Sequence, residues 1–173
     1  MEHSWIPHAR YERDKNPERI RKWEHDGEVT IIPGDYVDYS YVLDWFNEQA
    51  QKYDITIIRY DPAKAIRLNK ELEEAGFETD KVRQGFFTLG GAMQNFKELL
   101  LDGKVVFNEQ SMFKWYLNNV HLRQDRNDNW LPTKTSQSRK IDGFAAALDA
   151  HVSVVDMLVE PDNGGPASMY ISF

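Results

Sequence analysis

The amino-acid sequence predicts an α/β fold, in which helices alternate with strands around a sheet that is at least partly parallel. Segments with helical periodicity alternate with short runs of β-forming residues along the chain. The run Ile55–Tyr60 is almost continuous in β-formers, as in a strand that is covered on both faces. The chain has 173 residues and no linker that would divide it. We therefore expect one domain over residues 1–159 and a flexible, turn-rich tail over residues 160–173.

The N-terminal segment is charged and is interrupted by prolines, of which Pro7 is the first. It predicts an extended arm followed by a short helix at Pro17–His25, because proline suits the first turn of a helix. Val29–Ile32 is rich in β-branched residues and predicts a strand, which Pro33 ends.

Asp38 is a good helix-capping residue, and it predicts a helix that runs to about Gln51. The strand Ile55–Tyr60 follows. Pro62 then suits the first turn of the next helix, and Gly76 suits its C-terminal end.

The second half of the chain continues the alternation. Apolar residues at helical spacing predict helices at about Leu89–Leu101, Glu109–Val120 and Ile141–Val159. Lys81–Gln84 predicts a short strand. Arg123–Pro132 predicts a hairpin, because it contains an Asn-Asp-Asn turn signal.

Composition excludes several classes of protein. The chain has no cysteine, so it has neither disulfides nor thiolate metal sites. No apolar run approaches the length that spans a bilayer, and the N-terminus has no signal-peptide pattern, which fits a cytoplasmic protein without a membrane partner. The histidines lack zinc-site spacing. The LGGA segment lacks the lysine and preceding strand of a phosphate-binding loop.

Charge is unevenly distributed along the chain. The net charge of −7 argues against an indiscriminate nucleic-acid binder. The segment from residue 123 to residue 140 nevertheless carries five basic residues against two acidic ones, a net charge of +3. Its basic residues are Arg123, Arg126, Lys134, Arg139 and Lys140. This segment is either a local phosphate-binding patch or an ordinary polar surface loop.

Two aspartates are candidates for chemistry. Asp61 stands at the end of the buried strand, where α/β proteins bind ligands, although Asp-Pro is also a common turn pair. Asp142 stands at the start of the last helix, where an acid is also favoured by the helix dipole. If that helix packs beside the strand, the two carboxylates converge and suit Mg²⁺ or Mn²⁺. Asp149 and Asp156 lie further along the helix, and we expect them to be solvated surface residues because seven residues rise about 10.5 Å.

Five segments in a fixed order carry a resemblance to a known family. In order and spacing the chain, from about Trp5 to about Val155, resembles the C-terminal nuclease region of a tailed-bacteriophage terminase large subunit of the HK97-like type. The most specific features are YDP, then NN, the basic hairpin and KIDG. The segments are SWIPHARYERDKNPERIRKWEHDGEVTIIPGDYVDYSYVLDWF, YDITIIRYDPAKA, EEAGFETDKVRQGF, LGGAMQNFKELLLDGKV and WYLNNVHLRQDRNDNWLPTKTSQSRKIDGFAAALDA.

The resemblance implies an RNase H-like mixed sheet flanked by helices, with an acidic cluster that binds Mg²⁺ or Mn²⁺. Such nuclease regions cut concatemeric viral DNA during packaging, so the chain is expected to be a metal-dependent DNA endonuclease. By position, Asp61 and Asp142 resemble two of the catalytic, metal-binding acids. Lys134, Arg139 and Lys140 resemble basic residues that contact DNA phosphates. The resemblance also implies double-stranded viral DNA, the small terminase subunit and the portal as partners, in the cytoplasm of the bacterial host.

The sequence departs from the family at its N-terminal side. The family's first acid lies on a first strand that precedes the matching region, and neither that strand nor the ATPase domain has a counterpart here. We therefore expect an N-terminally truncated fold with an incomplete metal site. In RNase H-like sheets the first strand lies beside the strand that corresponds to Ile55–Tyr60. Its absence would leave an open sheet edge and favour self-association or N-terminal rearrangement.

Two other functions stay open on the sequence alone. The chain could be a catalytically incomplete fragment that binds DNA or a packaging partner through its basic hairpin, and the missing first acid favours this alternative. It could also be another RNase H-like enzyme, related to resolvases or transposases. The segment WLPTKTSQSRKIDG favours the terminase over that third reading.

Overall fold

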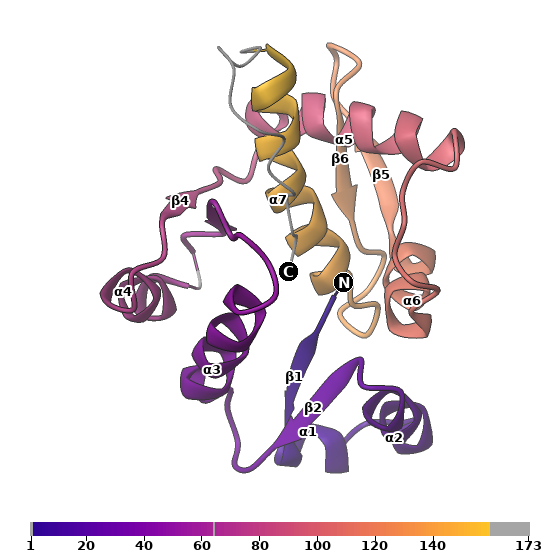
Figure 1. Ribbon diagram of the computed structural model, residues 1–173. Coiled ribbons are helices and arrows are strands. Elements are labelled where there is room, and N and C mark those ends of the chain that lie inside the picture. Colours follow the sequence, from indigo (N-terminus) through magenta and orange to yellow (C-terminus); the bar gives the residue numbers. More distant parts are fainter. Residues whose placement is uncertain (1, 64, 160–173) are drawn as a thin grey trace.

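The structure, a computed structural model, describes residues 2–63 and 65–159, and the tail expected over residues 160–173 lies outside these described residues. Helices and strands alternate along the chain (Figure 1). The helices are α1 (His8–Glu12), α2 (Pro17–His25), α3 (Tyr39–Ala50), α4 (Ile66–Glu74), α5 (Phe86–Leu101), α6 (Ser111–Asn119) and α7 (Asp142–Val159). The strands are β1 (Ser4–Pro7), β2 (Val29–Ile32), β3 (Ile58–Tyr60), β4 (Thr79–Lys81), β5 (His121–Gln124) and β6 (Trp130–Thr133).

The strands pair in twos. β1 pairs with β2 and β3 pairs with β4, both in parallel, whereas β5 and β6 form the predicted antiparallel hairpin. Each parallel pair is joined through helices, as parallel strands require. The α/β class is therefore confirmed. The described strands form three small sheets instead of one continuous mixed sheet, because β1 and β3 are each paired on one edge only.

Local capping signals place two of the predicted helices. The side chain of Asn16 accepts a hydrogen bond from the backbone N–H of Arg19 at 3.1 Å, and Pro17 follows at the first helical position of α2. The side chain of Asp38 accepts from the N–H of Ser40 at 3.0 Å and begins α3. Each interaction satisfies an amide that has no partner within its helix.

The expected N-terminal arm is wrong for residues 4–7, which form β1. Ser4 pairs with Val29 and Pro7 with Ile32, so β1 lies parallel to β2 along its whole length. The His3 ring, which precedes β1, contacts the Thr30 hydroxyl at 2.9 Å. The strand exists because β2 offers it a hydrogen-bonding edge, which local sequence does not reveal.

The strand predicted at Ile55–Tyr60 is shorter in the structure, because only its last three residues reach β4. The strand expected at Lys81–Gln84 accordingly ends at Lys81. The helix expected from Pro62 begins four residues later, at Ile66. The carboxylate of Asp61 accepts the N–H of Ala63 at 2.9 Å, and this local turn replaces the first helical turn.

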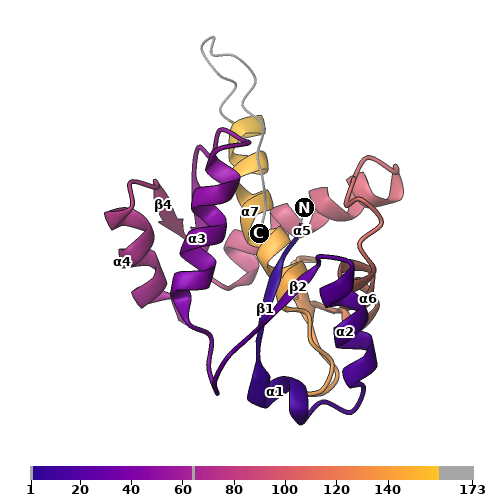
Figure 2. The same cartoon turned by 60° about the horizontal axis from the view of Figure 1, so that its bottom comes forward.

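The buried apolar side chains form two clusters. The larger cluster joins α2, β2, α5, α6 and α7, and the smaller joins α3, β3 and α4. α7 packs against α5, α6 and β3, and it lies between the two parts of the molecule in both views (Figures 1 and 2). Within the described ranges, no helix is long and apolar enough to cross a membrane.

Candidate functional site

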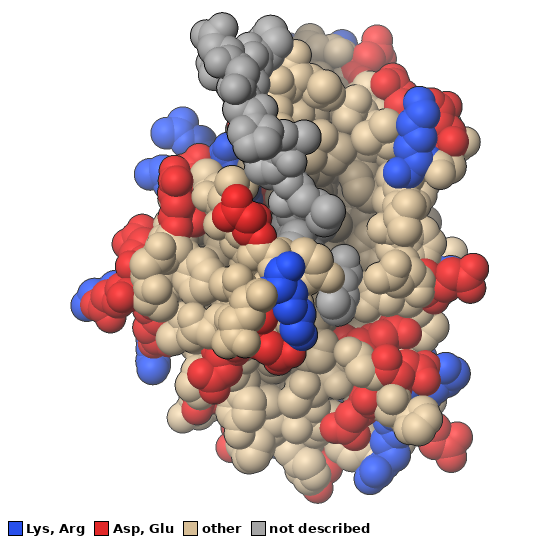
Figure 3. Space-filling view, in the orientation of Figure 1, with Lys and Arg blue, Asp and Glu red and all other residues tan. Residues whose placement is uncertain are grey.

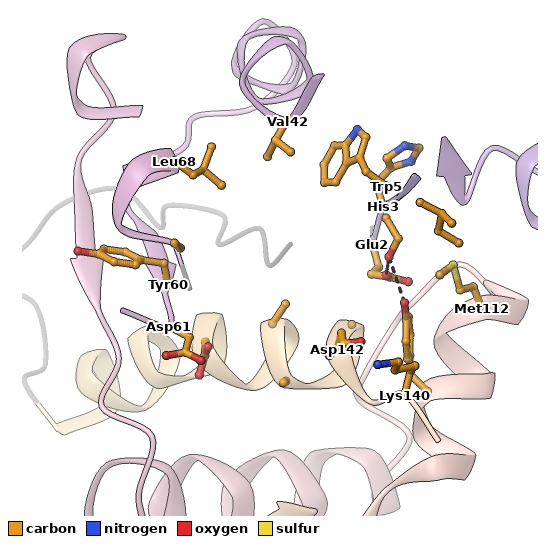
Figure 4. Close-up of a pocket in the computed structure, with 18 of the residues that line it drawn as sticks. Glu2, His3, Trp5, Val42, Tyr60, Asp61, Leu68, Met112, Lys140 and Asp142 are labelled. Atoms are coloured by element: carbon orange, nitrogen blue, oxygen red, sulfur yellow. Dashed lines mark hydrogen bonds between the residues drawn. The ribbon is translucent and has the colours of Figure 1, made fainter. Parts of the chain in front are cut away.

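A pocket of about 590 Å³ lies along α7, and β1 and β3 contribute to its walls (Figure 4). Its apolar lining includes residues from both hydrophobic clusters. Asp61, Lys140 and Asp142, which were predicted from the sequence, all line this pocket. Lys134 and Arg139 are not among its lining residues.

Asp142 begins α7 and is exposed at one end of the pocket. The segment that leads to it is held by Asn119, a buried residue at the end of α6. The Asn119 amide donates a hydrogen bond to the Lys140 backbone carbonyl at 2.8 Å, and its oxygen accepts one from Arg139 at 3.4 Å. Asn119 therefore fixes the position of the two basic residues beside Asp142.

Glu2 lies at the same end of the pocket as Asp142 (Figure 4). Its side chain is only 6% exposed, and Ser4 donates a hydrogen bond of 2.8 Å to its Oε1 atom. Burial, and to a smaller degree the charge of Glu28, raise the pKa of Glu2 to about 7 against the opposing effect of the Ser4 bond. Burial and the nearby Glu2 also raise the pKa of Tyr116. Sequence reasoning missed Glu2 because it stands among many charged residues.

Gly143 shows how closely α7 approaches this corner. A Cβ atom at Gly143 would lie 2.6 Å from ring carbons of Tyr116 and 2.7 Å from Oε1 of Glu2. These separations are shorter than any ordinary contact, so only glycine fits at the second residue of α7. The absence of a side chain lets Glu2 and Tyr116 pack directly against the first helical turn, next to Asp142.

Asp61 follows β3 and lines the pocket further along α7 than Asp142 (Figure 4), and its charge acts on Asp149 of that helix. The expectation that Asp149 is a surface residue is wrong, because its side chain is 6% exposed and faces the pocket. Gln84 donates a hydrogen bond of 2.9 Å to its carboxylate. Burial, with a smaller contribution from Asp61, raises the pKa of Asp149 to about 6. Asp156, the other aspartate of the helix that was expected at the surface, is exposed.

The structure does not bring Asp61 and Asp142 against each other. Asp61 is near Asp149, and Asp142 is near Glu2, so the carboxylates form two pairs at two levels of α7. In the described part of the chain, no group of three or more acidic or histidine side chains is placed to hold a metal ion.

Arg59 fixes the position of β3 against α7. Its guanidinium donates hydrogen bonds to Ser153 at 2.9 Å and Asp156 at 2.9 Å on α7, and to Asp80 at 2.6 Å on β4. The Arg59 side chain is only 15% exposed, whereas Asp80 and Asp156 are at least half accessible to solvent, so these pairs are partly shielded from water. This network sets where Asp61, two residues later, meets the helix.

The basic residues predicted to contact DNA all follow the β5–β6 hairpin. Lys134 follows β6 directly and is half-buried, whereas Arg139 is exposed. On the face that Figure 3 shows, acidic and basic side chains are interspersed and form no extended basic surface. Any attraction of phosphates is therefore local to this segment.

The donors at the Asp142 end of the pocket suit a hard divalent cation. Mg²⁺ and Mn²⁺ prefer oxygen ligands, and Mg²⁺ is commonly held by one or two carboxylates together with water and substrate phosphate. Oε2 of Glu2 is buried and has no hydrogen-bond partner. An exposed carboxylate next to an unpartnered carboxylate oxygen is a fitting donor set for such an ion.

The sequence matches one family model. This model, described as the endonuclease domain of the terminase large subunit, matches residues 2–156. Among curated proteins, the chain is 25% identical over 146 residues to the terminase large subunit of Enterobacteria phage HK97, covering 82% of this chain and 29% of that protein. It is 24% identical over 154 residues to protein YmfN of Escherichia coli K12, covering 84% and 34%.

A third curated relative is also a phage terminase large subunit. The chain is 27% identical over 137 residues to the terminase large subunit of Lactococcus phage SK1, covering 73% of this chain and 25% of that protein. The chain thus spans a quarter to about a third of the length of these relatives. Its fold is similar to that of the crystal structure of the HK97 large terminase, with a TM-score of 0.76 and 24% identity, covering 86% of this chain and 32% of the other.

Proposed function

This chain belongs to the family of terminase large subunit endonuclease domains, and on this premise we propose that it is the nuclease module of a phage DNA-packaging machine. Its substrate is concatemeric double-stranded viral DNA. The reaction is hydrolysis of a phosphodiester bond by water, assisted by a divalent cation. We propose the cytoplasm of an infected or phage-carrying bacterium as its location.

One observation carries the proposal for the site. Asp61 and Asp142 stand far apart in the sequence, yet both line the pocket along α7, and Lys140 lines it beside Asp142. A pocket with acidic groups and an adjacent cation suits a substrate that is a phosphodiester, because the acids suit metal ions and the lysine suits a phosphate.

Asp61 and Asp142 are the residues that we propose to hold Mg²⁺ or Mn²⁺. When bound, such a cation stabilises charge on the phosphate and lowers the pKa of a bound water. Asp142 offers its carboxylate from the exposed start of α7. The carboxylate of Asp61 is oriented by the hydrogen bond from Ala63. Asp142 begins α7, whereas Asp61 lies beside the middle of this helix. Each acid therefore has a different carboxylate near it, Glu2 for Asp142 and Asp149 for Asp61.

Lys134, Arg139 and Lys140 are the residues that we propose to contact DNA phosphates. Asn119 holds the backbone of Lys140 and the side chain of Arg139 in place. In the part of the chain that the structure describes, no carboxylate forms an ion pair with any of these three basic residues. Their charges therefore remain available to a phosphate backbone.

Cleavage of supercoiled plasmid in the presence of Mn²⁺ tests the proposal. The wild-type chain should nick and linearise the plasmid, and Asp61→Ala and Asp142→Ala should each remove most of that activity. Equal activity in the wild type and both variants would refute the assignment of the site.

A second candidate function is binding without catalysis. The observation that favours it is the lack, in the described residues, of three acids gathered around one point. A chain of this kind would bind DNA or a packaging partner through the β5–β6 hairpin and residues 134–140. Salt-sensitive DNA binding by the wild type, without cleavage in Mn²⁺ or Mg²⁺, would select this function over the first.

We further propose three protein partners: the small terminase subunit, the portal and a second copy of this chain. Self-association is supported by the strand edges, since within the described residues β1 pairs only with β2 and β3 only with β4. An open edge next to apolar pocket walls favours pairing with another chain. Light scattering at tens of micromolar protein should show dimers or larger species, and a monomer at every concentration would oppose this.

A further inference from the structure

Glu2 is a buried acid whose backbone is fixed by hydrogen bonds and whose carboxylate is only partly satisfied. Its backbone N–H donates to the side chain of Gln110 at 2.8 Å, and its backbone carbonyl accepts from the same amide at 2.7 Å. The side chain is 6% exposed and lines the pocket. Oε1 accepts from Ser4, whereas Oε2 has no hydrogen-bond partner. A buried carboxylate oxygen without a partner is costly, so a partner that completes the site is expected.

Acidic side chains lie around Glu2, and within the described residues no side chain forms an ion pair with it, although the N-terminal amino group is a positive charge that lowers its pKa. Glu28 is close enough to affect its charge, and Asp142 stands at the adjacent start of α7. Lys140 lines the pocket, but no ion pair joins it to either Glu2 or Asp142 in the described structure. Glu28 is already engaged, because it accepts hydrogen bonds from Ser111 and Met112. Glu2 and Asp142 are therefore two carboxylates that no described side chain neutralises in an ion pair.

We propose that Glu2 and Asp142 together bind a divalent cation at the N-terminal end of α7. Glu2 contributes the buried oxygen Oε2, and Asp142 contributes an exposed carboxylate that leaves room for water and a substrate phosphate. Gly143 is what allows this arrangement, since any side chain there would collide with Glu2. The assignment rests on the proposed nuclease function for its biological meaning, but the binding of the cation can be measured by itself.

Calorimetric titration of the full chain with Mn²⁺ tests the assignment. The variants are Glu2→Gln, which keeps the size and the acceptor for Ser4, Asp142→Asn, and the double variant. Glu74→Gln, an exposed residue of α4, is the matched control. Both single variants should weaken Mn²⁺ binding at least about tenfold, the lower bound for residues that merely support metal ligands. The double variant should lose little more than either single variant, because one site is lost in each.

Glu2→Asp provides a second test of the same position in case Glu2→Gln does not fold. It keeps the charge but shortens the side chain, and it should bind Mn²⁺ with an affinity between those of the wild type and Glu2→Gln. Circular dichroism of each metal-free variant should show the wild-type fold. Unchanged Mn²⁺ affinity in folded Glu2→Gln overturns the assignment.

The two proposals fail in different ways. If plasmid cleavage depends on Asp142 but neither cleavage nor Mn²⁺ affinity depends on Glu2, the nuclease function survives and the Glu2 assignment is wrong. If Mn²⁺ affinity depends on both acids but the wild type cleaves no DNA, the cation site stands and the nuclease function of this chain is wrong.

Discussion

Asp61, in the turn after β3, acts electrostatically on Asp149 of α7, and burial together with this smaller effect raises the pKa of Asp149 to about 6. Asp149 comes from the middle of the helix and Asp61 from the turn after the strand. The hydrogen bond from Gln84 offsets part of the cost of burying the charge. At neutral pH, the ionised carboxylate of Asp149 therefore destabilises the packing of α7 against β3.

Replacement of this carboxylate should change the pH dependence of stability. Folding raises the pKa of Asp149 from 3.8 to about 6. The free-energy cost of ionising this buried carboxyl group is therefore absent below the unfolded pKa and complete above about pH 6. Asp149→Asn should therefore raise the free energy of unfolding relative to the wild type at pH 7.5 more than at pH 4. The difference is about 3 kcal/mol at most, since one pKa unit corresponds to about 1.4 kcal/mol.

Urea unfolding of the wild type and Asp149→Asn at both pH values, with a chelator present, measures this difference. Asp44→Asn, an exposed aspartate of α3, is the control, and its effect should not change with pH in this way. A pH-independent difference for Asp149→Asn would contradict the raised pKa.

A second prediction concerns the glycine at the start of α7. Gly143→Ala should lower the free energy of unfolding by about 1–3 kcal/mol, because the new methyl group collides with the buried ring of Tyr116 and with Glu2. Gly91→Ala, within α5, is the matched control, since nothing lies within 4 Å of its Cβ position. That control should gain about 0.5–1 kcal/mol from helix propensity. Equal effects in chemical denaturation would show that the corner is not closely packed.

A third prediction concerns a long-range helix cap. The carboxylate of Glu28 accepts hydrogen bonds from the N–H of Ser111 at 2.9 Å and of Met112 at 2.6 Å, and so joins β2 to the start of α6. Glu28→Gln places an amide donor against these donors and should cost about 1–3 kcal/mol in unfolding experiments. Glu74→Gln should cost little. A negligible loss for Glu28→Gln would show that this carboxylate does not cap the helix.

A fourth prediction concerns DNA binding. Arg139→Ala and Lys140→Ala should each weaken binding to all DNA sequences alike and reduce the salt dependence by about one counterion. Fluorescence anisotropy over a range of salt concentrations measures both effects. Lys70→Ala, on the exposed face of α4, should leave them unchanged. An unaltered salt slope in the first two variants would exclude these residues from the DNA interface.

Features that depend on local sequence were predictable. Asn16 and Asp38 mark the starts of α2 and α3, because their side chains bond to amides within three residues. Features that depend on distant pairing were not. β1 forms only because β2 lies beside it, and Pro7 in its sequence suggested an unpaired arm. The length of β3 is likewise set by β4.

The candidate site was predictable in part for the same reason. Asp61 and Asp142 stand at a strand end and a helix start, and both line the pocket. Asp149 was misjudged because helical spacing shows which residues share a face, but not that β3 covers that face. Glu2 gave no signal, since its neighbours Gln110, Tyr116 and Gly143 come from distant parts of the chain.

The initial rate of plasmid cleavage in Mn²⁺ shows whether Asp61 and Asp142 form a metal-dependent nuclease site. Asp44→Ala, an exposed aspartate of α3, is the control for loss of an acid as such. We predict cleavage by the wild type and Asp44→Ala at similar rates. In Asp61→Ala and in Asp142→Ala the rate should fall at least about tenfold, as for residues that hold or support a metal. Cleavage by both of these variants at the wild-type rate would show that neither acid belongs to the nuclease site.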